Sequence, residues 1–114
     1  MEIQEQQNGD VDIVSISGKL DAYSSTDLDK KFNLLITASR VKLVVNCEKL
    51  EYVSSSGLRV FIAALKKAKK LNGDVKLSCL KPPIHEVLKM SGFTQLFTIT
   101  ENVSAAIAGF SNPQ

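Results

Sequence analysis

The sequence contains few of the residues that hold metals or carry redox chemistry. Its 114 residues include one histidine and two cysteines, Cys47 and Cys79. The cysteines fall at the ends of two predicted strands and lack the close, paired spacing of zinc sites and thioredoxin-like motifs. We therefore expect both to be reduced core residues, and we expect neither a metal site nor a cofactor.

The sequence also lacks a large charge excess and a long apolar segment. It has 14 Lys and Arg against 12 Asp and Glu, whereas direct nucleic-acid binders concentrate Lys and Arg to neutralise phosphates. The longest apolar run, Val60–Leu65, is too short to cross a bilayer, and the start, MEIQEQQNGD, lacks the features of a signal peptide. We expect a cytoplasmic protein with no direct nucleic-acid binding and no membrane insertion.

Two common serine-containing site motifs are missing as well. A serine nucleophile needs a general base, but the sole histidine, His85, falls in the first turn of a predicted short helix. The sequence around Ser54–Ser56 is not G-x-S-x-G, and it has neither the paired glycines nor the lysine of a P-loop. His85 is expected to be a partly exposed surface residue. These absences argue against an enzyme.

The hydrophobic pattern predicts alternating strands and helices in one domain over residues 1–114. In chain order the predicted elements are an edge strand Glu2–Gln7 with a turn at Asn8-Gly9-Asp10, a strand from Val11 that Gly18 helps to end, a helix started by Ser24 and Asp27 as a capping-box-like pair, a buried strand around Val41–Val45, a helix from the serines to about Asn72-Gly73, a strand Val75–Cys79, a short helix Pro82–Met90, a strand Leu96–Ile99 and a helix Val103–Phe110. This order indicates an α/β fold with a mixed, mostly parallel sheet of four to five strands and about four helices. The final SNPQ is expected to fray.

Three consecutive serines stand between a predicted strand and a basic, amphipathic helix, in the stretch Glu51–Ile62, EYVSSSGLRVFI. One interpretation is local: Ser54 or Ser55 caps the helix by accepting a backbone N–H, while Gly57 eases the turn. The free N–H groups and the dipole of a helix start also favour an anion, including one attached covalently to a serine. The pattern alone leaves capping and modification open.

Longer stretches of the sequence resemble one family: GKLDAYSSTDL at 18–28, LVVNCEKLEYVSSSGLRVFIAALKKAK at 43–69 and VLKMSGFTQLFTIT at 87–100. Over nearly the whole chain, they are similar to the STAS domains of anti-sigma-factor antagonists. The resemblance implies a single STAS-like domain. In that family the central stretch usually reads aspartate, serine, serine or a small residue, glycine, leucine, and a partner phosphorylates the first serine. Aligned on Gly57-Leu58, that serine is Ser55, and Ser54 is the rival acceptor.

The resemblance also implies a mechanism. The unmodified antagonist binds an ATP-dependent anti-sigma serine kinase and frees a sigma factor, the phosphorylated form does not bind, and a serine phosphatase resets the switch. The partner-binding residues implied are Asp21, Ser54, Ser55, Ser56, Gly57 and Arg59. For Asp21, a purely local role as a turn or capping residue stays open.

Ser54 occupies the position that the family usually gives to aspartate. Three alternatives follow: altered kinase recognition, a shift of the modification to Ser54, or a member that is never phosphorylated. The last would make the chain a STAS adaptor without a phosphoswitch, for example in a lipid-transport or signalling assembly.

Basic residues recur on one side of the predicted second helix. Arg59, Lys66 and Lys70 share that side with Ala63, and Lys67 and Lys69 flank it. Such a run usually forms a solvated face. Because this face extends from the serine stretch, the alternative is that it steers an acidic partner, or that Arg59 contacts nucleotide phosphate in a kinase complex.

Overall fold

Strands and helices alternate along residues 1–111, which are the residues that this computed structural model describes. In chain order the elements are β1 (Glu2–Asn8), β2 (Val11–Leu20), α1 (Ser25–Thr37), β3 (Lys42–Val53), α2 (Ser55–Lys70), β4 (Asp74–Ser78), α3 (Pro82–Met90), a short 3₁₀ helix η1 (Phe93–Gln95), β5 (Thr98–Thr100) and α4 (Val103–Ser111). Their order and types confirm the predicted α/β class.

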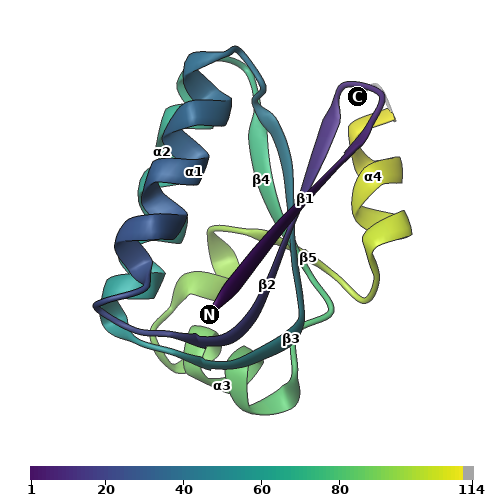
Figure 1. Cartoon of the computed structure of the whole chain (residues 1–114). Helices are drawn as coiled ribbons and strands as arrows, with labels where there is room; N and C mark the ends of the chain where they lie inside the picture. The colour runs from purple at the N-terminus through teal and green to yellow at the C-terminus, as the bar shows by residue number, and fades with distance from the viewer. Residues whose placement is uncertain (112–114) are drawn as a thin grey trace.

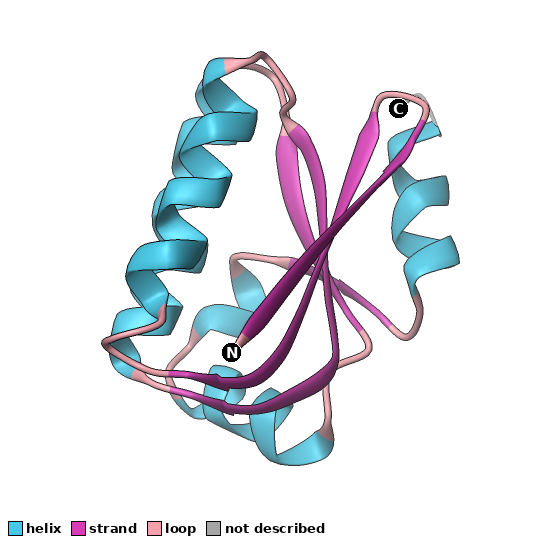
Figure 2. Cartoon of the chain, in the orientation of Figure 1, coloured by secondary structure: helices cyan, strands magenta, loops and turns pink. Residues whose placement is uncertain are grey.

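A single sheet contains the five strands in the order β1-β2-β3-β4-β5 (Figure 2). The first pair is antiparallel and is joined by the predicted hairpin, in which Gly9 has a φ of 63°. Glycine adopts this left-handed conformation without steric cost. The remaining pairs are parallel, which confirms a mixed, mostly parallel sheet with β3 at its centre.

Helices cover both faces of the sheet. Figure 1 shows α1 and α2 on one face and α4 on the other, with α3 near the end of the sheet at which α1 and α2 begin. Successive strand residues point to opposite faces. Leu43 and Val45 therefore lie in the main core, whereas Val44 lies in a second cluster with Val11 and Ile13 beneath α4. This double coverage explains the nearly continuous apolar run that predicted a central strand.

Helix α2 turns its predicted apolar face to the sheet. Leu58, Phe61 and Leu65 are buried, and Ile62 is partly buried against the same core. The Phe61 ring meets Phe97 edge to face, with 6.5 Å between the ring centroids. The helical spacing of these residues was therefore interpreted correctly.

Two strands are longer than predicted. β2 continues past Gly18, which has a φ of 91°, and ends at Leu20. The pairing of β2 with β3 shifts register next to Gly18, so this glycine accommodates an irregularity inside the strand and the expectation that it ends the strand is wrong. β3 continues to Val53, which places Cys47 fully buried within the strand and not at its end.

Two further predictions were wrong in detail. Ser24 precedes α1, but its side chain makes no capping hydrogen bond, because its Oγ accepts the Asp21 N–H at 3.0 Å and donates to the Lys19 carbonyl at 2.9 Å. The last strand begins at Thr98 and not at Leu96, since Leu96 is the C-cap of η1 and the buried Phe97 comes before the strand.

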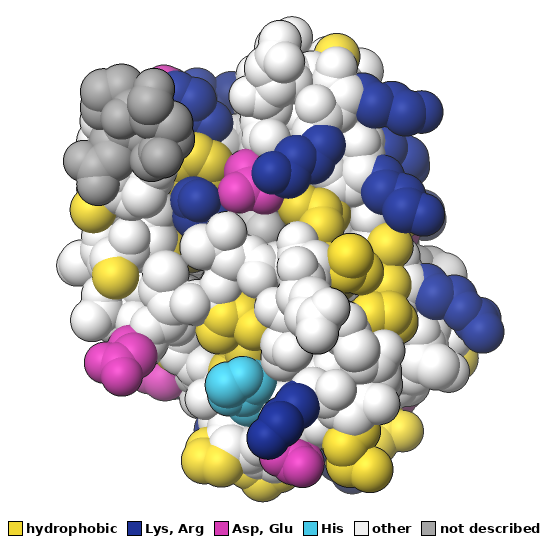
Figure 3. Space-filling view, turned by 180° about the vertical axis from the view of Figure 1, so that it is seen from behind, with side chains coloured by type: hydrophobic (Ala, Val, Ile, Leu, Met, Phe, Trp, Pro, Cys, Tyr) yellow, Lys and Arg dark blue, Asp and Glu magenta, His cyan; other side chains and the backbone are white. Residues whose placement is uncertain are grey.

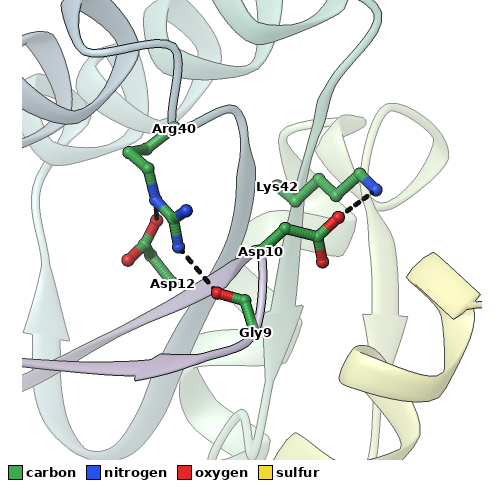
Figure 4. Close-up of polar contacts among 5 residues, drawn as sticks. All are labelled: Gly9, Asp10, Asp12, Arg40 and Lys42. Atoms are coloured by element: carbon green, nitrogen blue, oxygen red, sulfur yellow. Dashed lines mark hydrogen bonds and ion pairs between the residues drawn. The ribbon is translucent and has the colours of Figure 1, made fainter.

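Charged residues tie the β1-β2 hairpin to the connection between α1 and β3 (Figure 4). Asp12 is almost fully buried and accepts a hydrogen bond from Arg40 Nε at 2.6 Å, and Arg40 also donates to the Gly9 carbonyl at 3.1 Å. Lys42 Nζ donates to Asp10 at 2.6 Å. This cluster lies at the end of the sheet opposite to the starts of α1 and α2 (Figure 1).

The C-terminal helix α4 packs on the sheet through Val103, Ala106, Ile107 and Phe110. It ends at Ser111, and the fraying predicted for SNPQ otherwise falls on residues 112–114, outside the described residues. Across residues 1–111, no helix has both the length and the apolar content that crossing a membrane requires.

Candidate partner-binding site at the start of helix α2

Two strand-to-helix connections lie next to each other where β2 and β3 end. The two strands are parallel neighbours, and Leu20 is the register partner of Val53. The Ser54 backbone N–H donates to the Leu20 carbonyl at 2.8 Å. Asp21 therefore begins one connection beside the point where Ser54 begins the other, at the end of the sheet where α1 and α2 start (Figure 1).

Ser54 is the N-cap of α2. Its backbone is extended, with φ −88° and ψ 171°, and its Oγ accepts a hydrogen bond from the Gly57 N–H at 3.2 Å. Its carbonyl accepts the N–H of Leu58 at 3.0 Å, which starts the helical hydrogen-bond series. Of the two predicted capping residues, the structure selects Ser54. Its half-buried side chain is engaged in holding the helix start.

Ser55 is the first residue of α2, and its side chain is exposed. The backbone N–H groups of Ser55 and Ser56 have no hydrogen-bond acceptor within residues 1–111, as expected for the first turn of a helix. Arg59, one turn further along, is also exposed. The helix start therefore combines an accessible hydroxyl, free N–H donors and the positive end of the helix dipole.

Gly57 is required by packing, not by a turn. It lies within α2 and is buried, and a Cβ at this position would approach Leu20 Cγ to 2.7 Å and Val53 Cγ2 to 3.0 Å. The expectation that Gly57 eases a turn is therefore wrong. Its small size lets the first turn of α2 approach the end of β2 closely.

Asp21 organises the neighbouring connection. Its Oδ1 accepts hydrogen bonds from the Tyr23 N–H at 3.1 Å and the Ser24 N–H at 2.9 Å, and it lies 3.0 Å from Ser24 Oγ. The hydrogen bonds from the Ser24 backbone and then its hydroxyl hold the pKa of Asp21 below its usual value, because they favour the charged carboxylate. Asp21 thus forms a tight turn and carries a negative charge at neutral pH.

Tyr23 is a candidate contact residue that the sequence analysis did not single out. It lies in the Asp21 turn and is 89% exposed, which makes it the most exposed of the large hydrophobic residues described. Tyrosine is enriched in protein interfaces because it combines a large apolar ring with a hydroxyl. An aromatic residue inside a polar strand-to-helix turn was the available signal.

The other residues with chemically reactive side chains do not join this site. His85 is exposed in the first turn of α3. Burial raises the pKa of the Cys47 thiol to about 12, so it stays protonated. Among residues 1–111, no group of three or more His, Cys, Asp or Glu side chains is arranged to hold a metal ion.

Comparison with known proteins identifies the family. Residues 2–106 match the family model described as STAS domain. The chain belongs to the STAS domain family. This STAS domain is 29% identical over 98 residues to BtrV of Bordetella bronchiseptica, across 86% of the chain and 84% of the relative. It is 27% identical over 103 residues to the anti-sigma F factor antagonist of Paenibacillus polymyxa, across 90% of the chain and 88% of the relative. BtrV also belongs by name to the anti-sigma factor antagonists.

Solved structures confirm the predicted STAS fold. The structure of the Bacillus protein SpoIIAA has been solved in an unphosphorylated and a phosphorylated form. They align with this STAS domain with TM-scores of 0.86 and 0.77, respectively. The alignment with the unphosphorylated form covers 99% of both chains. The alignment with the phosphorylated form covers 96% of this chain and 99% of SpoIIAA. The sequence identities are 17% and 18%, so these matches support the fold alone.

Proposed function

We propose that this STAS domain is an anti-sigma factor antagonist controlled by phosphorylation of Ser55. In its unmodified form it binds an anti-sigma serine kinase and thereby releases a sigma factor. The kinase uses ATP to phosphorylate Ser55, which turns binding off, and a serine phosphatase restores the binding form. The domain acts in the cytoplasm as a binding module and not as an enzyme.

The contrast between Ser54 and Ser55 carries the proposal. Ser54 is half-buried and its Oγ is occupied as the N-cap of α2, whereas Ser55 is exposed at the first helical position. A kinase must place the acceptor hydroxyl in line with the γ-phosphate of ATP, and only Ser55 meets that requirement without loss of the helix cap. This contrast favours Ser55 over its neighbour as the acceptor.

The helix start accommodates a phosphate once it is formed. The N–H groups of Ser55 and Ser56 are free within residues 1–111, and a phosphate near them is stabilised by the helix dipole. The modified domain should therefore stay folded. Loss of binding then has to come from the docking surface and not from unfolding.

A phosphate in the docking surface is sufficient to abolish binding. Phosphoserine adds about −1.5 to −2 charges at pH 7, and removing such a group from water without a paired cation costs several kcal/mol. A micromolar complex is held together by about 8 kcal/mol. A cost of several kcal/mol would therefore weaken such a complex by orders of magnitude.

The relatives support this function by name. BtrV and the Paenibacillus polymyxa protein are named as anti-sigma factor antagonists, and SpoIIAA was solved in a phosphorylated form. The substitution of Ser54 for the aspartate usual in the family removes a negative charge next to the acceptor. An adaptor without a phosphoswitch is the second candidate, and this substitution is the observation that favours it.

The test is phosphorylation of the wild type, Ser55→Ala and Ser54→Ala by the anti-sigma kinase of the source organism with ATP, followed by peptide mapping. We expect phosphate on Ser55 in the wild type and in Ser54→Ala, and none in Ser55→Ala. Unmodified wild type and Ser55→Ala should both bind the kinase, whereas phosphorylated wild type should not. Ser55→Asp should bind less tightly than wild type, although its single charge makes it an incomplete mimic.

Two results would overturn the proposal. Undiminished phosphate in Ser55→Ala would move the acceptor to Ser54. Equal kinase binding by the phosphorylated and unphosphorylated wild type would remove the switch and leave the adaptor without a phosphoswitch.

A further inference from the structure

Helix α2 carries an unusual concentration of positive charge. Its 16 residues include Arg59, Lys66, Lys67, Lys69 and Lys70 and no acidic residue, although the whole chain has a net charge of only +2. Figure 3 shows basic side chains spaced along the side of the molecule that carries α1 and α2. The balance of charge in the complete sequence therefore conceals a local excess on one helix.

Some of these cations have partners within the domain, and some do not. Lys67 Nζ donates to Asn33 Oδ1 at 2.8 Å, and Lys69 Nζ lies 3.5 Å from Asp74 Oδ1. Arg59, Lys66 and Lys70 are exposed and form no ion pair within residues 1–111. These three residues, which we call the basic face of α2, supply charge that the fold itself does not use.

The basic face is aligned with Ser55. With 3.6 residues per turn, Ser55, Arg59, Lys66 and Lys70 fall within an arc of about 60° around the helix. Lys67 and Lys69 fall about 90° and 70° from the centre of this arc, on opposite sides, where they reach their partners on α1 and β4. Ser55 therefore lies in line with the three free cations. The line from Ser55 to Lys70 extends about 22 Å along α2, at a rise of about 1.5 Å per residue.

We propose that the basic face of α2 is a docking surface for an acidic surface of the protein partner that recognises Ser55. This proposal rests on the proposed function and specifies the chemistry of that partner. Arg59, Lys66 and Lys70 pair with carboxylates of the partner when Ser55 is unmodified. They increase the rate of association and fix the direction in which the partner lies along α2.

Phosphorylation acts directly on this surface. A phosphate on Ser55 lies one turn before Arg59, in the arrangement of an anion four residues ahead of a cation that stabilises helices. It neutralises the nearest cation of the basic face and places a negative charge in line with Lys66 and Lys70. An acidic partner is then repelled at the position where it was attracted.

An acidic protein fits the basic face better than nucleic acid or a membrane does. Three cations neutralise too few phosphates for strong binding to duplex DNA at physiological salt. By the same geometry, Ile62 and Ala63 lie about 20° beyond the two edges of this arc, and both are partly buried. The face therefore presents no exposed aromatic or large aliphatic side chain for insertion into a bilayer. Carboxylates on a folded partner require neither a large number of cations nor an apolar side chain that inserts into a bilayer.

The experiment uses the kinase that phosphorylates Ser55 as the probe and measures its association with the unmodified domain over a range of salt concentrations. The variant Arg59→Gln/Lys66→Gln/Lys70→Gln should bind about tenfold more weakly at low salt, mainly through slower association. Its affinity should also depend less on salt than that of the wild type. Arg59→Lys should retain most of the binding, because it keeps the charge.

The control changes the same number of charges elsewhere. Lys30, Lys49 and Lys89 are exposed on α1, β3 and α3, and the variant with Gln at all three should bind nearly as tightly as the wild type. Equal weakening in the two triple variants would overturn the docking surface, since only net charge would matter. If the triple variant has a lower melting temperature than the wild type, the single variants of the basic face are compared with the wild type in its place.

The two proposals fail in different ways. If phosphorylation leaves binding of the wild type unchanged, the proposed function fails, and the docking surface for that partner fails with it. If phosphorylation blocks binding but the basic-face variant binds like the control variant, only the docking surface is overturned. The choice of an acidic protein would also be overturned by a different result. In that result, the wild type binds phosphatidylserine vesicles or duplex DNA as tightly as it binds the kinase, and the basic-face variant loses this binding.

Discussion

Adjacent residues of the same type have different roles at the start of α2. Ser54 has an extended backbone, so its Oγ can accept the Gly57 N–H and cap the helix. Ser55 is already helical, and its side chain is exposed to solvent. One step along the chain therefore separates a serine committed to structure from a serine available for modification.

At the residue scale, the structure sharpens the prediction for Asp21. Asp21→Asn retains a side-chain carbonyl that accepts the N–H groups of Tyr23 and Ser24 but loses the charge that strengthens these hydrogen bonds, so the melting temperature at pH 7 should fall only slightly. Kinase binding should weaken, by about tenfold if the lost carboxylate faces a cation of the partner. Calorimetry or surface plasmon resonance measures the binding, and thermal unfolding by circular dichroism measures the stability. A low melting temperature with normal binding by the folded fraction would make Asp21 purely structural.

Gly57→Ala should destabilise the domain, although alanine is usually the better helix residue by about 1 kcal/mol. The added methyl would lie 2.7 Å from Leu20 Cγ and 2.8 Å from its Cδ2, and overpacking of this kind costs about 1 to 3 kcal/mol. Denaturant titration measures the change. Gly109→Ala in α4 is the comparison, because its methyl would lie 3.2 Å from Lys76 Cε, a looser approach than the one at Gly57, and should cost less. A more stable Gly57→Ala would contradict the close approach of α2 and β2.

At the scale of elements, α2 has three different surfaces. Its buried surface carries Leu58, Phe61 and Leu65 and packs on the sheet. Its N-terminus supplies Ser55, and its basic face points away from the core. Burial of the first surface fixes the rotation of the helix, and this rotation decides which residues share a line with Ser55.

Phe61→Ala tests that rotation. Phe61 is fully buried, so its truncation should cost about 3 to 5 kcal/mol of unfolding free energy through lost burial and the cavity left behind. Ile62→Ala, one residue later and only partly buried, should cost less. Urea titration gives both values, and a loss below about 1 kcal/mol for Phe61→Ala would show that this face does not pack on the sheet.

At the scale of the whole molecule, the ion pairs of the β1-β2 hairpin lie at one end of the sheet, and the Asp21 turn and Ser55 lie at the other. At the hairpin end, the buried Asp12 pairs with the partly exposed Arg40, and Asp10 pairs with Lys42. The other end contains the Asp21 turn and the start of α2 with Ser55, and the basic face extends from there along α2 toward the hairpin end. The charges at the hairpin end connect elements to one another, while those on the basic face remain available to a partner.

Stability should fall in acid because carboxylates at both ends have depressed pKa values. A hydrogen bond from Lys42 lowers the pKa of Asp10, and hydrogen bonds from Ser24 lower that of Asp21, from an ordinary value of 3.8. Each group therefore contributes stability at pH values above its unfolded pKa, and this contribution is lost as the pH falls through the folded pKa.

The double variant Asp10→Asn/Asp21→Asn should thus show a shallower loss of unfolding free energy than the wild type between pH 5 and pH 2. Urea titration at each pH measures this slope. The matched control is Glu86→Gln/Glu101→Gln, which removes two carboxylates that accept no hydrogen bond within residues 1–111. Equal slopes in the two double variants would mean that the hydrogen bonds to Asp10 and Asp21 do not set the acid response.

Local patterns in the sequence were sufficient for the fold class and for placing the three serines between a strand and a helix. The turn at Gly9 predicted the hairpin, the apolar run around Leu43 predicted the central strand, and the spacing of Phe61 and Leu65 predicted α2. Each of these signals depends on a few neighbouring residues, so each can be interpreted without knowledge of the rest of the chain. The resemblance to STAS domains came from equally short stretches.

Only the tertiary structure decided which side chains are already engaged in contacts within the domain. In β4, Lys76 and Ser78 alternate with apolar residues, yet both are buried, with Lys76 Nζ 4.6 Å from the centroid of the Phe110 ring in α4. The need for Gly57 beside Leu20 and the partners of Lys67 and Lys69 likewise depend on distant segments meeting in space, whereas the Ser54 cap is a local contact with Gly57. A residue's type determines what it can bind, but its neighbours in the folded chain determine whether that capacity is already used.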